Sequence, residues 1–356
     1  GRKIFGHDIF RSRMLSFEPN VNIAVPDDYV LGAGDDIDIN VNGASHHASH
    51  HTISPNGVIV LDLTGPVTLA GQTLSAARRT LKARLSPFYS GSTISVNVGQ
   101  TRSIGIHVMG EVAVPGSYTP SAFATVFHAL YMAGGTNDLG TLRNIKVYRH
   151  NKLVTVVDIY DYILNGKLTG NVRLADNDVI VVGPYDCLVT ITGKVKRPMI
   201  YEMKKNESVN SLLKYSGGFT GDAYKKSVRI HRKTGRDYSV YNVEEFDFSS
   251  FHIDDGDSVS VDSILPRYSN TVEIKGAVFR PGMYNLGEQI NSVRTLVEHA
   301  EGLTEDAFTA RAVMHRMKSD RSLEVIAVDI AGVMNGTVAD IPLKENDVLF
   351  IPTRQE

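Results

Sequence analysis

The sequence predicts an α+β protein in which one N-terminal domain is followed by three tandem β-grasp modules. The first observation is a repeat: GEVAVPGSYTP begins at Gly110, and diluted copies, GKVKRPMIYEM and GAVFRPGMYNL, begin at Gly193 and Gly276, so the interval is 83 residues both times. The second is that each copy leads into a short helical pattern that stops at glycine. The third is composition, because 31 glycines, no tryptophan and short Val/Ile runs broken by Gly, Asn and Asp favour a β-rich chain.

The region before the repeats predicts a separate domain over residues 27–102, preceded by an N-terminal extension over residues 1–26. Within it, YVLGAGDDIDINVNG predicts a turn and a strand, ISPNGVIVLDLTGPV a hairpin, and STISVNV a closing strand. Between them, GQTLSAARRTLKARLSPFY predicts an amphipathic helix with leucines on one face. The other face carries Arg78, Arg79 and Lys82, which indicate either a basic stripe for phosphate or a polyanionic sugar, or an ordinary solvated helix face.

Each repeat reads as strand, turn, strand, short helix, strand, variable linker and closing strand. In the first copy Pro115 and Gly116 form the turn, since proline presets φ and glycine tolerates positive φ. The helices are ATVFHALYMAGG, VNSLLKYSGG and VRTLVEHAEG, and the closing strands are DVIVV, DSVSV and DVLFI. A helix this short needs an apolar partner surface, so we expect a small mixed sheet with one helix across a face. The modules are expected over residues 103–186, 187–266 and 267–356.

A carboxylate that follows Gly or Asn stands just before each closing strand and before the first strand of the N-terminal domain. These residues are Asp35, Asp178, Asp257 and Asp347. Such a set suggests a metal or acid/base site, but Asp also accepts backbone N–H bonds in turns, and Gly or Asn adopts the left-handed conformation there. Because a catalytic carboxylate needs a distinct partner and a repeated turn supplies none, we predict structural turns.

Composition and motifs exclude several classes of function. A formal net charge of −2 provides no field that attracts nucleic acid. The single cysteine, Cys187, excludes an internal disulfide framework and is expected to be a small buried hydrophobe. Neither a G-x-S-x-G elbow nor a phosphate-binding loop occurs, and no apolar run is long enough to span a bilayer. We therefore predict no catalytic residue, no cofactor and no direct membrane span.

The segment HHASHH places His46, His47, His50 and His51 close together in the sequence. Pairs four residues apart would chelate a metal if the segment were helical. Its flanks, NVNGAS and TISPNG, instead predict a solvated loop between strands. These histidines are therefore weak candidates, and we predict no metal.

The order of these motifs resembles the bacterial outer-membrane polysaccharide export proteins. In that family an export domain is followed by soluble-ligand-binding β-grasp (SLBB) modules. The resemblance covers residues from about 27 to 352: YVLGAGDDIDINV, then ISPNGVIVLDLTGPVTLAGQTLSAARRTLKARL, then repeats headed G-x-V-x-x-P-G-x-Y. The family's first stretch is close to Y-x-L-x-P-G-D-x-[LIV], and here Tyr29, Leu31, Gly34 and Asp35 match while Ala33 replaces the proline.

The resemblance implies a non-enzymatic periplasmic part of a machine that exports capsular polysaccharide or exopolysaccharide across the outer membrane of a Gram-negative bacterium. Family members assemble into rings and work with an inner-membrane polysaccharide co-polymerase. Two features differ, because no cysteine for a lipid anchor precedes Cys187 and the sequence ends on an expected strand rather than a pore-forming helix. Either those parts are missing from this sequence or the pore belongs to another polypeptide.

Sugar contacts are predicted at the hairpin turns of the second and third repeats, since aromatic faces stack on sugar rings and basic side chains bind hydroxyls and carboxylates. The candidate residues for glycan or interface contact are Lys196, Arg197, Tyr201, Arg280 and Tyr284. The tyrosines have a competing interpretation as core anchors. An oligomeric conduit or collar for the polymer is the favoured function. A monomeric periplasmic glycan-binding protein is the alternative, and a polysaccharide-modifying enzyme is disfavoured because no paired acid/base residues stand apart from the turns.

Overall fold

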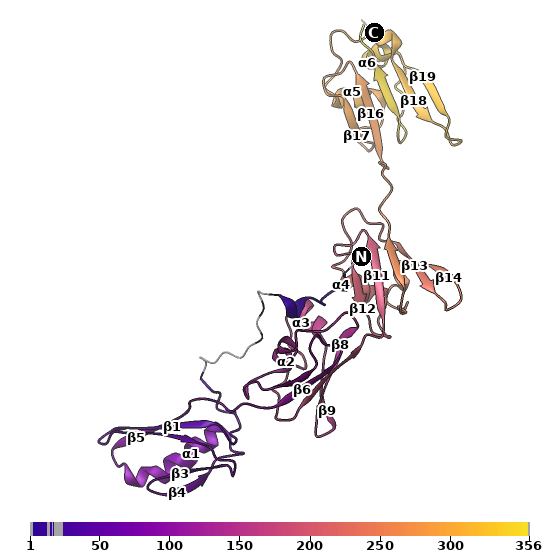
Figure 1. The fold of residues 1–356 in the computed structure, drawn as a ribbon. Coiled ribbons are helices and arrows are strands. Elements are labelled where there is room, and N and C mark those ends of the chain that lie inside the picture. The colour runs from indigo at the N-terminus through magenta and orange to yellow at the C-terminus, as the bar shows by residue number, and fades with distance from the viewer. Residues whose placement is uncertain (1–2, 13–14, 16, 18–23, 355–356) are drawn as a thin grey trace. The chain divides into compact units, whose positions relative to one another are not determined.

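A computed structural model describes residues 3–12, 15, 17 and 24–354 of the chain (Figure 1). It divides into two compact units, Gly1–Ile264 and Leu265–Glu356, which are described separately. The predicted fold class is confirmed, because a small α/β domain is followed by three sheets of identical strand order, each with short helices. Of the predicted N-terminal extension, residues 1–2, 13–14, 16 and 18–23 lie outside the described part of the chain.

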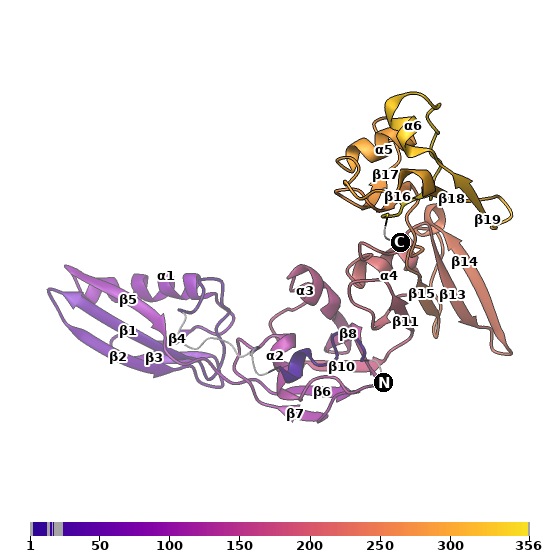
Figure 2. The same cartoon turned by 90° about the horizontal axis from the view of Figure 1, so that it is seen from above.

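The N-terminal domain is a three-stranded antiparallel sheet, ordered β2-β1-β5, with a separate hairpin β3-β4 and one helix. Figure 2 shows α1 running along the sheet beside β5. Thr73 caps the helix by accepting the N–H of Ala76, and the leucines of the predicted apolar face are buried. The elements are β1 (Asp36–Gly43), β2 (His47–Thr52), β3 (Val58–Leu61), β4 (Gly65–Thr68), α1 (Leu74–Leu85), the 3₁₀ turn η2 (Ser86–Phe88) and β5 (Ser92–Val98).

Module 1 contains a five-stranded sheet ordered β7-β6-β10-β8-β9. The closing strand β10 pairs parallel to β6 and antiparallel to β8, which makes the mixed sheet that the repeat predicted. Its elements are β6 (Ile106–Gly110), β7 (Gly116–Tyr118), α2 (Val126–Met132), β8 (Gly140–Arg149), β9 (Lys152–Val157), α3 (Ile159–Asn165) and β10 (Val179–Pro184).

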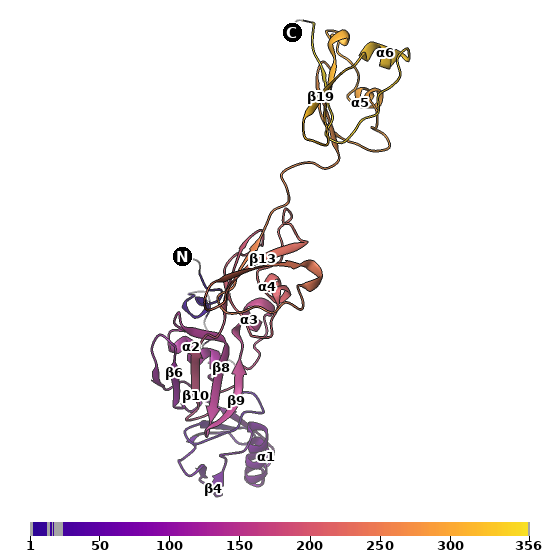
Figure 3. The same cartoon turned by 90° about the vertical axis from the view of Figure 1, so that its right-hand side faces the viewer.

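Modules 2 and 3 repeat this strand order as β12-β11-β15-β13-β14 and β17-β16-β20-β18-β19. Module 2 comprises β11 (Leu188–Gly193), β12 (Ile200–Glu202), α4 (Val209–Tyr215), β13 (Ser227–Lys233), β14 (Tyr238–Glu244), the 3₁₀ turn η3 (Glu245–Asp247) and β15 (Ser258–Val261). Module 3 comprises β16 (Thr271–Gly276), β17 (Gly282–Asn285), α5 (Val293–His299), the 3₁₀ turn η4 (Thr309–Arg311), β18 (Val313–Met317), β19 (Leu323–Ala327), α6 (Ile330–Asn335) and β20 (Val348–Ile351). Figure 3 shows α5 and α6 on the same side of the third sheet.

The expected variable linker is ordered in all three modules. In each, the third strand continues into a hairpin with an edge strand (β9, β14 or β19), and a second short helix or 3₁₀ turn follows. The linker sequences differ among the repeats, so repetition did not reveal them. Their own alternation of apolar residues is the signal for a strand.

The glycine that opens each repeat is required by the packing of parallel strands. Gly110, Gly193 and Gly276 all have φ between 88° and 95°, in the left-handed region. A Cβ at any of the three would lie 2.1 Å from a backbone oxygen of the closing strand. Glycine is therefore the residue that allows the first strand to end against the last one.

The N-terminal segment, residues 3–12, lies against the SLBB-like part of the chain. Ile4 pairs parallel with Ile200 of β12, with the N–H of Phe5 donating to the Ile200 carbonyl at 2.8 Å. The Phe5 ring then packs on Tyr160 and Tyr201, 5.2 Å from each ring centre. The segment thus forms a single β-bridge to the edge strand of module 2 while its Phe5 ring also contacts module 1, which composition alone did not predict.

Candidate functional site

The four repeated aspartates form buried clamps. Each is at most 1% exposed, and each accepts a backbone N–H from the residue three positions earlier. Each also accepts N–H bonds from an arginine, and the pairs are Asp35 with Arg102, Asp178 with Arg149, Asp257 with Arg232, and Asp347 with Arg316. The preceding Gly or Asn has positive φ in all four turns, as predicted. All four carboxylates are engaged in structure, which accounts for their recurrence without chemistry.

The arginines of these clamps were not predicted, although the sequence contains a signal for them. Arg149, Arg232 and Arg316 occupy the same position near the end of the third strand in YRH, HRK and HRM. Each also donates to a backbone carbonyl before the clamp turn, at 2.9–3.5 Å. In the N-terminal domain the arginine comes instead from the segment leading to module 1, where Arg102 also donates to the Tyr29 hydroxyl at 2.9 Å.

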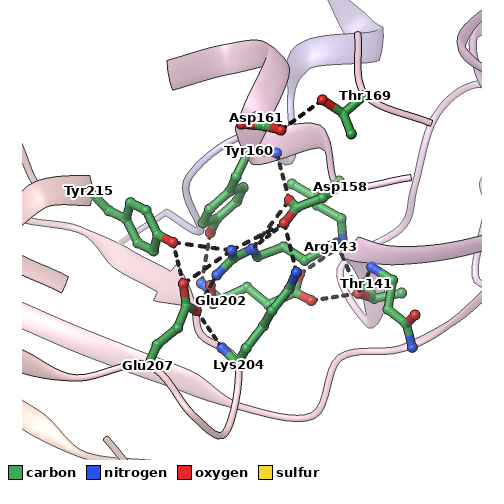
Figure 4. Close-up of polar contacts among 12 residues, drawn as sticks. Thr141, Arg143, Asp158, Tyr160, Asp161, Thr169, Glu202, Lys204, Glu207 and Tyr215 are labelled. Carbon is green, nitrogen blue, oxygen red and sulfur yellow. Dashed lines mark hydrogen bonds and ion pairs between the residues drawn. The ribbon is translucent and has the colours of Figure 1, made fainter. Parts of the chain in front are cut away.

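A second polar cluster joins module 1 to module 2 (Figure 4). Arg143 of β8 is 5% exposed and donates to Asp158 of its own module at 3.2–3.3 Å. It also donates to Glu207 and to the Tyr215 hydroxyl of module 2, the latter at 3.2 Å. Its guanidinium lies 4.7 Å from the Tyr160 ring centre and 5.0 Å from that of Tyr215. One cation is thus held by carboxylates and aromatic rings from both modules.

Glu202 is the other buried charge-bearing group at this junction. Its carboxylate accepts the Thr141 hydroxyl at 2.5 Å and the Leu142 N–H at 2.8 Å, both from module 1. Burial raises the pKa of Glu202, while these hydrogen bonds and nearby Arg143 oppose the shift. Burial lowers the pKa of Arg143, but bonds to Glu207 and Asp158 outweigh it and raise that pKa. The network fixes the two modules to each other. Its buried charged groups, Arg143 and Glu202, already have partners within the chain.

The repeated tyrosines serve mainly as turn anchors. Tyr118, Tyr201 and Tyr284 each donate their hydroxyl to the backbone carbonyl four residues earlier, at 2.5–2.6 Å. Tyr201 is fully buried, which agrees with its interpretation as a core anchor and leaves its ring no free face for a sugar. Tyr284 is partly exposed, and a sugar contact there stays a prediction.

The basic candidates differ in the freedom of their side chains. Arg197 donates to the Tyr215 carbonyl at 2.6 Å and lies 4.6 Å from the Phe5 ring centre, so it acts as a structural tie rather than as a surface sugar contact. Arg280 is 70% exposed and pairs with Glu301 at 3.0 Å. Lys196 is also exposed. These last two side chains remain accessible to a glycan.

The predicted basic stripe on α1 also contains both a structurally engaged side chain and exposed ones. Arg78 pairs with Asp27 at 2.5 Å and donates to the Val96 carbonyl of β5 at 2.9 Å, which ties the helix to the sheet. Arg79 and Lys82 are exposed on the solvent face. A polyanion contact at these two residues stays a prediction.

The histidine segment is a strand, not the expected loop. His47–Thr52 forms β2, which pairs antiparallel with β1. Side chains four residues apart on one strand are about 13 Å apart, so the imagined chelating pairs do not form. His50 instead pairs with Asp38 at 2.6 Å, His47 stacks on Tyr89 with ring centres 6.2 Å apart, and His51 contacts the Ser49 hydroxyl. His46 precedes the strand and lies 3.5 Å from the Asn42 side-chain oxygen.

Metal binding and thiol chemistry are two further possibilities in residues 3–12, 15, 17 and 24–354. No group of three or more His, Cys, Asp or Glu side chains in these ranges could hold a metal. Cys187 is buried, and burial raises the pKa of its thiol to about 12, which disfavours the reactive thiolate. Among these same residues, no helix has both the length and the apolarity needed to cross a membrane.

Comparison with known proteins places the two parts of the chain. A family model described as polysaccharide biosynthesis/export protein matches residues 23–99, and a model of the SLBB domain matches residues 106–160 and 188–242. Module 3 lies outside these matches but has the same strand order as the two modules within them.

Two curated relatives are named for polysaccharide transport or export. The polysialic acid transport protein KpsD of Escherichia coli is 26% identical over 334 residues, which cover 92% of this chain and 55% of KpsD. The EPS I polysaccharide export outer membrane protein EpsA of Ralstonia solanacearum is 30% identical over 151 residues, which cover 42% of this chain and 40% of EpsA. The chain thus spans about half the length of the curated relatives it matches. Because the export and SLBB models together match more than half of the chain, in the order that its motifs predicted, the chain belongs to the family of polysaccharide export proteins with SLBB domains.

Proposed function

We propose that this chain is the periplasmic part of an outer-membrane export complex for capsular polysaccharide or exopolysaccharide, in which several copies form a non-enzymatic conduit or collar around the polymer. One observation carries the proposal: an export domain is followed by three modules of one strand order, and a buried ion network joins the first two of them. Such a series of modules suits a scaffold better than an enzyme, because its repeated carboxylates are all engaged in structure.

The proposal includes a location and a set of partners. A relative named as a polysaccharide export outer membrane protein supports a periplasmic location in a Gram-negative bacterium. The partners in this proposal are the polysaccharide, further copies of the chain and an inner-membrane polysaccharide co-polymerase. Glycan contact is assigned to the exposed basic residues Lys196, Arg280, Arg79 and Lys82. Weak contacts repeated around a ring would guide a polymer without trapping it.

The first test is the solution mass of the chain over a concentration series, measured by light scattering on a sizing column. We expect a discrete oligomer larger than a dimer, because a closed ring has a fixed number of copies. A strict monomer at every concentration would contradict the collar and favour the monomeric glycan-binding alternative. The solution mass of the unchanged chain from these runs is also the reference for variants of the interface.

A further inference from the structure

The three modules differ in what lies between the first helix and the helix or 3₁₀ turn that follows the hairpin. In module 1 this place is filled by aromatic side chains of the N-terminal segment. Phe10 and Phe17 pack on Phe127 of α2, with ring centres 6.1 and 5.4 Å away. Phe17 also contacts Tyr162 of α3 at 5.9 Å. Gly135 allows this approach, since a Cβ there would lie 2.8 Å from the Phe10 Cβ.

In module 3 the same place is bridged by the module's own side chain. When the helices are aligned on their first valines, Arg294 of α5 occupies the position of Phe127. Its Nε and Nη2 donate to the Val333 carbonyl of α6 at 3.1 and 2.8 Å. This bridge ties the two helices together across the position that Phe10 and Phe17 occupy in module 1.

In module 2 the groove is open. It has a volume of about 460 Å³ and lies between α4 and η3. Asn210 and Lys214 stand where module 1 has Phe127 and Tyr131, and the aromatic floor is retained by Phe219 and Phe248, 6.3 Å apart. Lys225 adds a second exposed cation to the lining. The groove therefore keeps an apolar floor, and its rim carries two lysines and one glutamate, Glu245, which leaves a net positive charge.

We propose that the groove of module 2 binds Phe246 of a second copy of this chain. Phe246 lies in η3 and is 83% exposed, so it points away from the groove of its own module. Glu244 and Asp247 flank it in the sequence, and they complement Lys214 and Lys225, which outnumber the one carboxylate of the groove lining, Glu245. Module 1 demonstrates that a phenylalanine fits this kind of groove.

We call Phe246 with its acidic neighbours Glu244 and Asp247 the knob. The knob and the groove belong to neighbouring segments of one module, so one surface of the chain both inserts a knob and receives one. Two copies that each insert Phe246 into the other form a closed pair, whereas a ring forms when each copy inserts Phe246 only into the next copy. The inference rests on the proposed function and deepens it, by naming the self-assembly surface. Burial of an exposed aromatic ring in a desolvated pocket is the usual source of affinity in protein interfaces.

The first experiment compares the solution mass of the full chain with that of Phe246→Ala across a concentration series. We expect the variant to self-associate about tenfold or more weakly, because it removes a central aromatic anchor. Phe279→Ala is the matched control, since Phe279 is 62% exposed but lies in module 3, and its mass should equal that of the unchanged chain. Phe246 is largely in water, so its removal leaves the fold intact.

Charge reversal provides the second arm of the same test. The variant Lys214→Glu with Lys225→Glu, and the variant Glu244→Lys with Asp247→Lys, should each self-associate weakly because like charges then face each other. Mixed in equal amounts, the two variants should recover association with each other, since the reversed groove meets the reversed knob. Recovery on mixing is a result that misfolding cannot produce.

The outcomes separate this inference from the proposed function. Self-association that is unchanged in Phe246→Ala overturns the groove interface and leaves the collar standing. A stable dimer that dissociates in Phe246→Ala supports the interface but contradicts a ring, and a monomeric unchanged chain overturns both. If the lysine variant instead loses binding to oligosialic acid while self-association stays unchanged, the groove is a sugar site and the interface proposal is wrong.

Discussion

Two kinds of arginine–carboxylate bond in this chain have different roles. Arg149 and Asp178 recur at the same place in every module and hold a turn against its own sheet. Arg143 binds carboxylates from two modules, and the repeat positions that correspond to it hold Lys226 and Ala310. The comparison teaches that residues that follow the repeat build each module, while residues that break it join one module to the next.

The two bonds also differ in their exposure to water. The Arg149 side chain is 34% exposed, so water solvates part of the recurring pair. At the junction, Arg143 is 5% exposed and its partner Glu207 is 13% exposed. Removing one partner from a buried pair leaves the other charge in a poor solvent, which is the expensive case. Disruption of the junction should therefore cost more than disruption of a single clamp.

The largest predicted effect is that of Arg143→Ala. It should lower the free energy of unfolding of residues 1–264 by about 3–5 kcal/mol, because Glu207 and Asp158 lose their buried cation. Urea unfolding that compares the variant with the unchanged chain measures this difference. Lys226→Ala removes the exposed residue at the equivalent repeat position and should change stability by less than about 0.5 kcal/mol. Equal effects of the two substitutions would contradict the special role of the junction.

A smaller, local effect is predicted for the recurring clamps. Asp178→Asn, Asp257→Asn and Asp347→Asn should each cost about 1–3 kcal/mol, since an amide oxygen replaces a carboxylate that accepts two N–H bonds from arginine. Hydrogen exchange followed by mass spectrometry should show faster exchange in the substituted module. If Asp347→Asn accelerated exchange in module 1 as strongly as in module 3, the clamps would not be confined to single modules.

The contrast between recurring and single residues explains which features of the structure could be predicted from the sequence. The succession of elements along each module and the mixed sheet followed from the repeat, because a pattern that recurs at a fixed interval indicates what each copy needs in order to fold. Arg143, Glu202 and Glu207 were missed, since a single occurrence provides no register and their partners are distant in the sequence. Tyr201 was left open between a sugar contact and a core anchor, and Arg197 was a candidate contact, because the packing of both depends on Phe5 of the far N-terminal segment. The histidines of β2 were placed in a loop because their strand pairing depends on β1 rather than on local propensity.

The smallest effect predicted at the junction is a dependence of stability on pH that comes from Glu202. Burial raises the pKa of this carboxyl in the folded chain, so the folded protein holds the proton to higher pH than the unfolded chain does. Its contribution to stability is therefore complete below the ordinary glutamate pKa of about 4.3, and it is lost as pH rises through the folded-state pKa. Glu202→Gln retains an oxygen for the Leu142 N–H and an amide for the Thr141 hydroxyl, but it does not titrate.

Urea unfolding of the unchanged chain and of Glu202→Gln at several values of pH, starting near 4, isolates this group, because all other carboxylates are shared. The unchanged chain should become less stable relative to the variant as pH rises. Glu288→Gln, at an exposed position in module 3, is the matched control and should show a pH-independent difference. A constant difference for Glu202→Gln would mean that the hydrogen bonds from module 1 cancel the effect of burial. The junction would then be held by Arg143 and its partners, with no titrating component.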